Sequence, residues 1–226
     1  MTQFDLLEFA HKAALYFLPF LFALSFHEYA HGFVAKMKGD RTAELMGRLN
    51  LNPLTHMDPI GTFLLPMSAI AFGTPFFGWA KPVPVNPRNL SRPTEDMFWI
   101  ALAGPLSNLL LAAVGWVAVV VFVAFAGIPY QGGVVFEVMQ IFIVINLFLA
   151  FFNLIPLHPL DGGKVISRFI PSSWDRQLET FAPYAPFVLI VLFISGGFWI
   201  IAKPVFGLYS LLINSAVFVG ATLGGV

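Results

Sequence analysis

Phe26-His27-Glu28-Tyr29-Ala30-His31 is the stretch around which the rest of the chain is organised. It is an H-E-x-x-H motif set inside an apolar run that extends from Ala13 to Ala35. On a helix, His27 and His31 are four residues apart, so both imidazoles lie on one face about one turn apart. This spacing lets two ring nitrogens bind one metal ion, and Glu28 lies beside the first of them, where it can accept a proton from water.

The membrane setting of the motif favours a metal site over a chance match with two ordinary hydrogen-bonded histidines. Ionisable side chains are costly inside a membrane span, and those that occur there by default mark function. We therefore expect the first apolar segment to carry one side of a metal centre.

Composition indicates an integral membrane protein, so the lipid bilayer is one of its expected partners. The 226 residues are 58% hydrophobic and only 11% charged, whereas soluble domains carry about 25% charged residues. No polar stretch is long enough to bury a core of its own, so we expect a single transmembrane domain over residues 1–226. A formal net charge of zero gives no indication of nucleic acid as a partner, and the absence of cysteine excludes disulfides and thiol chemistry.

The apolar segments predict an all-α polytopic membrane protein. Three of them, at 13–35, 97–126 and 134–160, are near or above the roughly 20 residues that cross the hydrocarbon layer, and we expect these to form the core. Two further apolar helices are expected near the C-terminus, at 184–202 and 205–223, separated only by a Lys-Pro pair.

The apolar stretch from Ile60 to Trp79 differs from the others because glycine and proline interrupt it. The interruptions are Gly61, Pro66, Gly73, Pro75 and Gly78. They argue against one straight spanning helix and favour a re-entrant half-span that enters and returns. The sequence Gly78-Trp-Ala-Lys-Pro-Val-Pro-Val-Asn-Pro87 follows, and its prolines exclude a helix and fix an extended chain. We predict a short β-hairpin or edge strand there.

The basic residues predict the orientation of the chain in the membrane. Ten of the twelve lysine and arginine residues fall in three polar segments, 36–58, 81–96 and 164–179, and the loop at 127–133 has none. The positive-inside rule assigns these three segments to the cytoplasm. We therefore expect an integral protein of the cell (plasma) membrane whose basic loops are cytoplasmic.

This orientation makes Asp161 a candidate for the third metal ligand. His31 comes five residues before cytoplasmic Lys36, and Asp161 comes three residues before cytoplasmic Lys164, so both lie near the inner end of their helices. Two histidines and one carboxylate with an open fourth position form a catalytic zinc arrangement. The alternative is an ordinary turn residue in the tripeptide Asp-Gly-Gly. The metal geometry also requires that the stretch at 60–79 does not cross the membrane.

Three motifs, taken together and in this order, resemble the site-2 protease family of intramembrane zinc metalloproteases. They are His27-Glu-x-x-His31, Gly104-Pro-x-x-Asn108 and Asn153-x-x-Pro156-x-x-x-Leu160-Asp161-Gly162. The resemblance covers about residues 13–170, and the extended segment after Gly78 is similar to the family's membrane-associated β-hairpin. The chain resembles a short subgroup, because no stretch could be a PDZ or CBS domain.

The resemblance implies cleavage of a transmembrane or membrane-anchored protein substrate near the cytoplasmic face. It also implies one zinc ion per chain, bound by His27, His31 and Asp161, with Glu28 as the catalytic base. A regulatory membrane partner is left open, since the regulatory modules of many relatives are missing from this sequence.

Two asparagines match further positions of the family. Asn153 matches the asparagine that steadies the substrate or its oxyanion, and Asn108 matches a position that is structural or faces the substrate. His158 is either a hydrogen-bond partner near the metal or an ordinary interfacial histidine, and His56 is expected to be a loop residue.

Two other functions remain as alternatives to the protease. A metal-dependent membrane transport or binding protein would carry a line of ionisable groups along several spans, whereas the polar groups here cluster at one depth. A catalytically silent relative that acts as a binding partner would be expected to lack Glu28 or a ligand, and all four residues are present.

Overall fold

The computed structural model describes residues 5–73, 78–126 and 133–225, and helices are the only regular secondary structure in those ranges. Within these ranges, four stretches are long and apolar enough to cross a membrane. They are Leu6–Met37, which joins α1 (Leu6–Lys12), η1 (Ala13–Phe17) and α2 (Leu18–Met37), and the single helices α6 (Pro93–Ala126), α7 (Val134–Asn153) and α11 (Trp199–Gly224). The all-α fold class is therefore confirmed.

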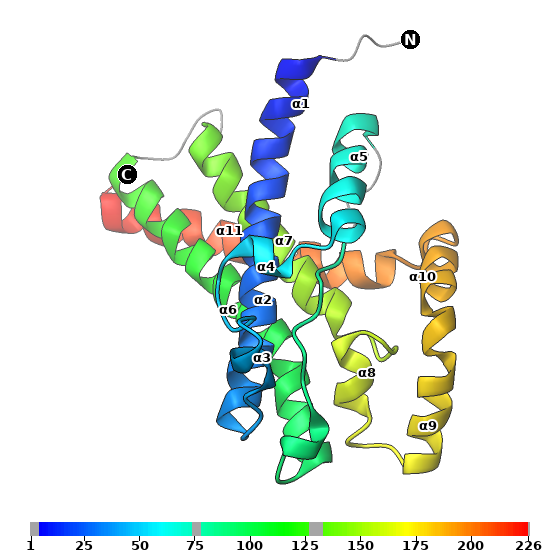
Figure 1. Cartoon of the computed structure of the whole chain (residues 1–226). Coiled ribbons are helices and arrows are strands. Elements are labelled where there is room, and N and C mark those ends of the chain that lie inside the picture. The colour runs from blue at the N-terminus through cyan, green and yellow to red at the C-terminus, as the bar shows by residue number, and fades with distance from the viewer. Residues whose placement is uncertain (1–4, 74–77, 127–132, 226) are drawn as a thin grey trace.

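Helix α6 is the central element of the fold. It packs against α2, α7 and α11, and against the short helix α8 (Asp161–Ile166) (Figure 1). The largest apolar core lies among α6, α7 and α11 and includes fully buried Val119, Ile143 and Val205. Helix α2 ends at Met37, and two residues later Gly39 takes a φ of 104°, a conformation that favours glycine and stops the helix.

The interrupted apolar stretch forms one short helix, Pro59–Phe72, in which η2 (Pro59–Leu64) continues directly into α5 (Leu65–Phe72). Its two ends meet: the Trp79 N–H donates to the Gly61 carbonyl at 3.1 Å, and the Thr62 hydroxyl donates to the Trp79 carbonyl at 2.7 Å. A side chain at Gly61 would collide with the Trp79 indole, since an added Cβ would lie 2.3 Å from it. Only glycine therefore allows this close return of the chain.

Residues 78–86, which we call the strap, run in an extended conformation along α2, but the predicted β-hairpin is not found in the described parts of the chain. The strap's N–H groups bind separate partners instead of a neighbouring strand. Lys81 donates to the His56 carbonyl at 2.9 Å, and Val83 donates to the Glu28 carboxylate at 2.8 Å. Pro82 and Pro84 have no N–H to donate, so a regular ladder could not form on both edges.

The C-terminal part contains two apolar helices, but their boundaries differ from those expected. Helix α9 (Ser172–Phe181) is followed by α10 (Ala185–Ile194), which ends well before residue 202, and α11 then runs through Pro204. The break lies at Gly196 and Gly197, where Gly196 takes a φ of 78°. The glycines, rather than Pro204, therefore interrupt the helix.

Asp40 fastens the loop after α2 to the end of the strap. It is fully buried and accepts hydrogen bonds from the Thr42 N–H, the Thr42 hydroxyl, the Asn86 N–H and the Asn89 side-chain amide. Burial alone would raise the pKa of the Asp40 carboxyl. The four hydrogen bonds lower this pKa by more than burial raises it, so it lies below its ordinary value.

We expect Asp40→Asn to destabilise the protein by about 1–3 kcal/mol at neutral pH. The NH₂ group of asparagine would face N–H and O–H groups that now donate hydrogen bonds to the carboxylate. A carboxyl group whose pKa is lowered in the folded state stabilises the fold at pH values above its ordinary pKa of about 4. This stabilisation is lost as the pH falls through the folded-state pKa. The difference in melting temperature between variant and wild type should therefore shrink below about pH 4. A difference that is constant with pH would contradict the assignment.

Candidate metal centre

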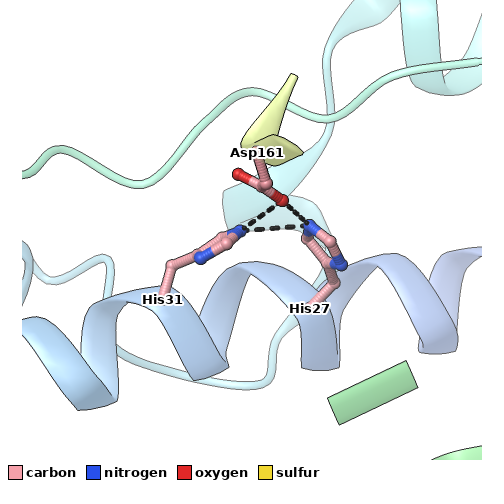
Figure 2. A group of neighbouring side chains, drawn as sticks. All are labelled: His27, His31 and Asp161. Atoms are coloured by element: carbon pink, nitrogen blue, oxygen red, sulfur yellow. Dashed lines mark hydrogen bonds and ion pairs between the residues drawn. The ribbon is translucent and has the colours of Figure 1, made fainter. Parts of the chain in front are cut away.

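Three buried side chains from two distant parts of the chain converge on one point (Figure 2). His27 and His31 lie on one face of α2, and Asp161 is the first residue of α8. The Nε2 atoms of the two histidines lie 3.0 Å from each other. The Oδ2 of Asp161 lies 3.0 Å from His27 Nε2 and 3.2 Å from His31 Nε2. The exposed fractions are 3% for His27, 9% for His31 and 8% for Asp161.

The loop before α8 folds back tightly to deliver Asp161 to α2. It connects the end of α7 at Asn153 to the start of α8. A Cβ added at Gly162 would lie 2.2 Å from the Ile155 carbonyl oxygen, so only glycine allows α8 to begin against this loop. The Asp-Gly-Gly tripeptide thus serves the turn, while the Asp161 carboxylate points to the two histidines (Figure 2).

The protonation of the two histidines follows from the partners on their other ring nitrogens. His27 Nδ1 lies 2.6 Å from the side-chain oxygen of Asn108, and His31 Nδ1 lies 2.6 Å from the carbonyl oxygen of Ile100. Both partners are acceptors, so each Nδ1 carries a proton, and each imidazole in its neutral form has its lone pair on the Nε2 that faces Asp161.

These three atoms fit a metal cation. The two Nε2 atoms and the Asp161 Oδ2 face one another within 3.2 Å, and with both imidazoles neutral all three atoms are acceptors. A buried set of mutually repelling acceptors is unfavourable unless a cation lies among them. Zinc binds imidazole at about 2.0–2.1 Å, for which tetrahedral ligands lie about 3.3 Å apart. The observed separations are close to this value.

Glu28 lies outside the group of three but next to it. Its side chain is buried, and the carboxylate accepts the Val83 N–H of the strap at 2.8 Å. As the residue after His27 in α2, it lies at the edge of the metal group, with one oxygen held by the strap.

Gly104 lets α6 approach the two histidines closely. A Cβ added at Gly104 would lie 2.5 Å from His31 Nε2 and 2.6 Å from His27 Cε1, distances that side chains do not show. The Gly-Pro-x-x-Asn motif therefore brings both a flat helix surface and the Asn108 amide to the site.

We expect Gly104→Ala to reduce the metal affinity more than about tenfold, because the new methyl group displaces both imidazole rings. Gly207→Ala in α11 is the matched control, since an added Cβ there has no atom within 4 Å. Metal titration of both purified variants measures the difference. Equal metal affinity in the two variants would show that the rings tolerate the methyl group.

The two asparagines that the sequence singled out lie in different surroundings. Asn108 is fully buried behind His27, and its Nδ2 donates to the Ala23 carbonyl at 3.2 Å and to the Asn146 side-chain oxygen at 3.0 Å. Asn153 is half-buried at the end of α7, and its amide donates to the Leu149 carbonyl of its own helix at 2.9 Å. The structure therefore brings Asn108, but not Asn153, into hydrogen-bond contact with His27, one of the three converging side chains.

Three contacts at the site were not foreseen from the sequence. The Ile100 carbonyl and the Val83 N–H are backbone groups, which no residue type reveals. Asn146 could have been found, because an amide inside the apolar run at 134–160 is as unusual as Asn108 in its own span.

The remaining histidines lie apart from the metal group. His158 Nε2 lies 3.6 Å from the Asp175 carboxylate, which also accepts the Ser167 hydroxyl. His56 was expected to be a loop residue, but it is the buried last residue of the short helix α4 (Pro53–His56), where its Nε2 donates to the Asn50 carbonyl at 2.8 Å.

Comparison with known proteins adds the family. Residues 127–194 match Peptidase family M50. The chain is 36% identical over 181 residues to a Bacillus subtilis protein named "Putative zinc metalloprotease YwhC", covering 79% of each chain. It is 29% identical over 175 residues to a Mycolicibacterium smegmatis protein, Rip2, named in the same way, covering 77% of this chain and 64% of Rip2, just under two thirds. No solved structure matches.

The relative from Bacillus subtilis is similar enough, over enough of its length, to assign the family. The match at 127–194 includes Asn153 and Asp161, two of the positions in the third sequence motif. This integral membrane protein therefore belongs to Peptidase family M50, the site-2 protease family that its motifs resemble.

Proposed function

We propose that the chain is an intramembrane zinc metalloendopeptidase, formed by one transmembrane domain over residues 1–226. The observation that carries this proposal is the convergence of two imidazole nitrogens and one carboxylate oxygen, on His27, His31 and Asp161, within 3.2 Å of one another at a buried position. Zinc is favoured by the two imidazoles and one carboxylate, and relatives of this chain are named as zinc metalloproteases. One such group in the described residues supports one zinc ion per chain.

The residues of the site divide the chemistry among them. His27, His31 and Asp161 would hold zinc, which supplies Lewis acidity that activates water near neutral pH and polarises a carbonyl. Glu28 takes the proton of the attacking water on its carboxylate and delivers it to the leaving amine. The Val83 N–H holds one Glu28 oxygen in place, which limits the carboxylate to a small range of orientations.

Contacts between the basic segments support their location in the cytoplasm. Lys38 binds Asp96 at 3.1 Å, and the Arg48 guanidinium donates to the Lys81 carbonyl at 2.9 Å, so the first two segments lie on one side of the membrane domain. The end of α2 and the starts of α6 and α9 point to the same side of the molecule (Figure 1). The plasma membrane is proposed on the same grounds.

The meeting of Gly61 with Trp79 supports a re-entrant half-span over the stretch between them. A segment that begins and ends at the same level does not cross, and the three core spans formed by α2, α6 and α7 then alternate in direction. This arrangement leaves the metal group near the cytoplasmic face, which is where we propose that the substrate is cut.

The substrate class we propose is a transmembrane or membrane-anchored protein. Peptide bonds in a helix are hidden by hydrogen bonds, so the substrate must unwind before attack, and the strap is an extended segment with which an unwound chain could pair. Pro82 and Pro84 have no N–H, so at these two positions the strap can only accept hydrogen bonds from a paired chain. Asn153 is proposed to bind substrate once it is present, and a regulatory membrane partner is an open part of the proposal.

Cleavage of a single-span test protein tests the function directly. The purified full-length chain, reconstituted in lipid vesicles with such a substrate, should release two fragments. A zinc chelator should stop the reaction, and added zinc should restore it. Cleavage that continues in excess chelator would overturn the metal-dependent mechanism, and zinc-driven uptake of ions without cleavage would favour transport.

A further inference from the structure

The side chain of Asn146 has no part in the chemistry described above, yet it ends a hydrogen-bond chain that reaches the metal group. It is 0% exposed in α7, where its neighbours Ile143 and Leu147 belong to the apolar core. A primary amide at such a position costs free energy unless both its donor and its acceptor are satisfied. Asn146 has partners for both.

The direction of each hydrogen bond is fixed by backbone carbonyls. The Phe142 carbonyl can only accept, so its 2.8 Å contact assigns the NH₂ of Asn146 to that side and turns the Asn146 Oδ1 toward α6. Asn108 Nδ2 donates to this oxygen at 3.0 Å and to the Ala23 carbonyl at 3.2 Å. Asn108 must therefore present its own oxygen to His27 Nδ1, at 2.6 Å.

We propose that Asn146 is a positioning residue that, through Asn108, holds His27 in the tautomer whose Nε2 lone pair faces the metal. This inference rests on the proposed zinc site. If the Asn108 amide turned over, its NH₂ would face His27 Nδ1 and favour the proton on Nε2, which could not then bind a cation. Turning would also set the Asn108 oxygen against two acceptors, one of which is Asn146.

His31 shows why only one of the two histidines needs this device. Its Nδ1 faces the Ile100 carbonyl, a backbone group that cannot turn over. His27 faces a side-chain amide, whose oxygen and nitrogen can exchange places. The buried polar chain from α7 through α6 to α2 therefore supplies for His27 the fixed direction that the backbone supplies for His31.

Two substitutions at Asn146 separate a positioning role from simple packing. Asn146→Leu keeps the branched shape and the number of side-chain heavy atoms but removes the acceptor. We expect zinc affinity to fall by only about tenfold, because the Ala23 carbonyl still restrains Asn108. Asn146→Asp, in the neutral form that full burial favours, keeps an oxygen for Asn108 and an O–H for the Phe142 carbonyl. We expect its zinc affinity to stay within about threefold of wild type.

Zinc affinity is measured on the full-length protein in detergent by competition with a chelator, with thermal melting to confirm folding. Ile143→Val, a purely apolar change one turn away in α7, is the control and should leave zinc affinity unchanged. Wild-type affinity in Asn146→Leu, or a loss in Asn146→Asp that equals or exceeds the loss in Asn146→Leu, would overturn the inference while leaving the zinc site intact. If Asn146→Leu does not fold, Asn146→Ala removes the same acceptor and carries the comparison. Wild-type protein that binds no zinc at all would overturn the proposed function itself.

Discussion

Glu28→Gln is expected to lower the rate of peptide-bond cleavage by about 10²–10⁴-fold while leaving zinc bound with unchanged affinity. The amide keeps the size of the carboxylate and an oxygen that can accept the Val83 N–H, so the strap stays in place. It cannot take a proton from water, which is the step that the account assigns to Glu28. Initial rates of fragment release and zinc content per chain are the two measurements.

The separation of these two readouts makes Glu28→Gln informative. A variant that loses zinc together with activity would indicate that Glu28 supports the metal site rather than the proton transfer. Undiminished cleavage would remove Glu28 from the chemistry. The inactive, zinc-loaded protein is also the form in which an uncut substrate is retained, so it can be used to capture one.

Asp161→Asn is expected to lower zinc affinity more than about 100-fold and to abolish cleavage, because loss of a ligand exceeds the effect of a neighbouring hydrogen-bond partner. The carboxylate supplies the negative charge and one of the three converging atoms, and a neutral amide supplies neither the charge nor an equally strong oxygen ligand. Zinc content after dialysis, together with the cleavage rate, measures the effect.

Asp175→Asn is the matched control for Asp161→Asn. It makes the same chemical change on α9, where the carboxylate contacts Ser167 and His158 rather than the metal group. We expect it to retain zinc and cleavage. Equal loss of zinc in both variants would indicate a general destabilisation of the α8–α9 region rather than the removal of a ligand.

The site was largely predictable because its signals are local or follow from depth. The spacing of His27 and His31 is a property of one helix. Asp161 lies 130 residues later than His31 in the sequence, yet the distribution of basic residues alone indicated that the two lie at similar depth. Their meeting in the structure, within 3.2 Å, agrees with that expectation.

The features that the sequence did not reveal depend on tertiary contacts. The strap was expected to pair as a hairpin, but Glu28 and the His56 carbonyl take its N–H groups, and no local pattern identifies such partners. The Lys203-Pro204 pair was expected to separate the last two helices, whereas the structure ends α10 at Ile194 and starts α11 at Trp199, with Gly196 and Gly197 between them. Asn146 stands out as an amide inside an apolar run, but its hydrogen bond to Asn108 depends on which helix it faces.

X-ray absorption at the zinc edge of the zinc-loaded, full-length protein tests the central claim most directly. We predict one zinc per chain, with two imidazole nitrogens at about 2.0–2.1 Å and the remaining ligands oxygen. Substitution of His27, His31 or Asp161 should remove the signal, and substitution of His158 should leave it unchanged. A third imidazole in the ligand shell, or a spectrum that Asp161→Asn does not alter, would contradict the account.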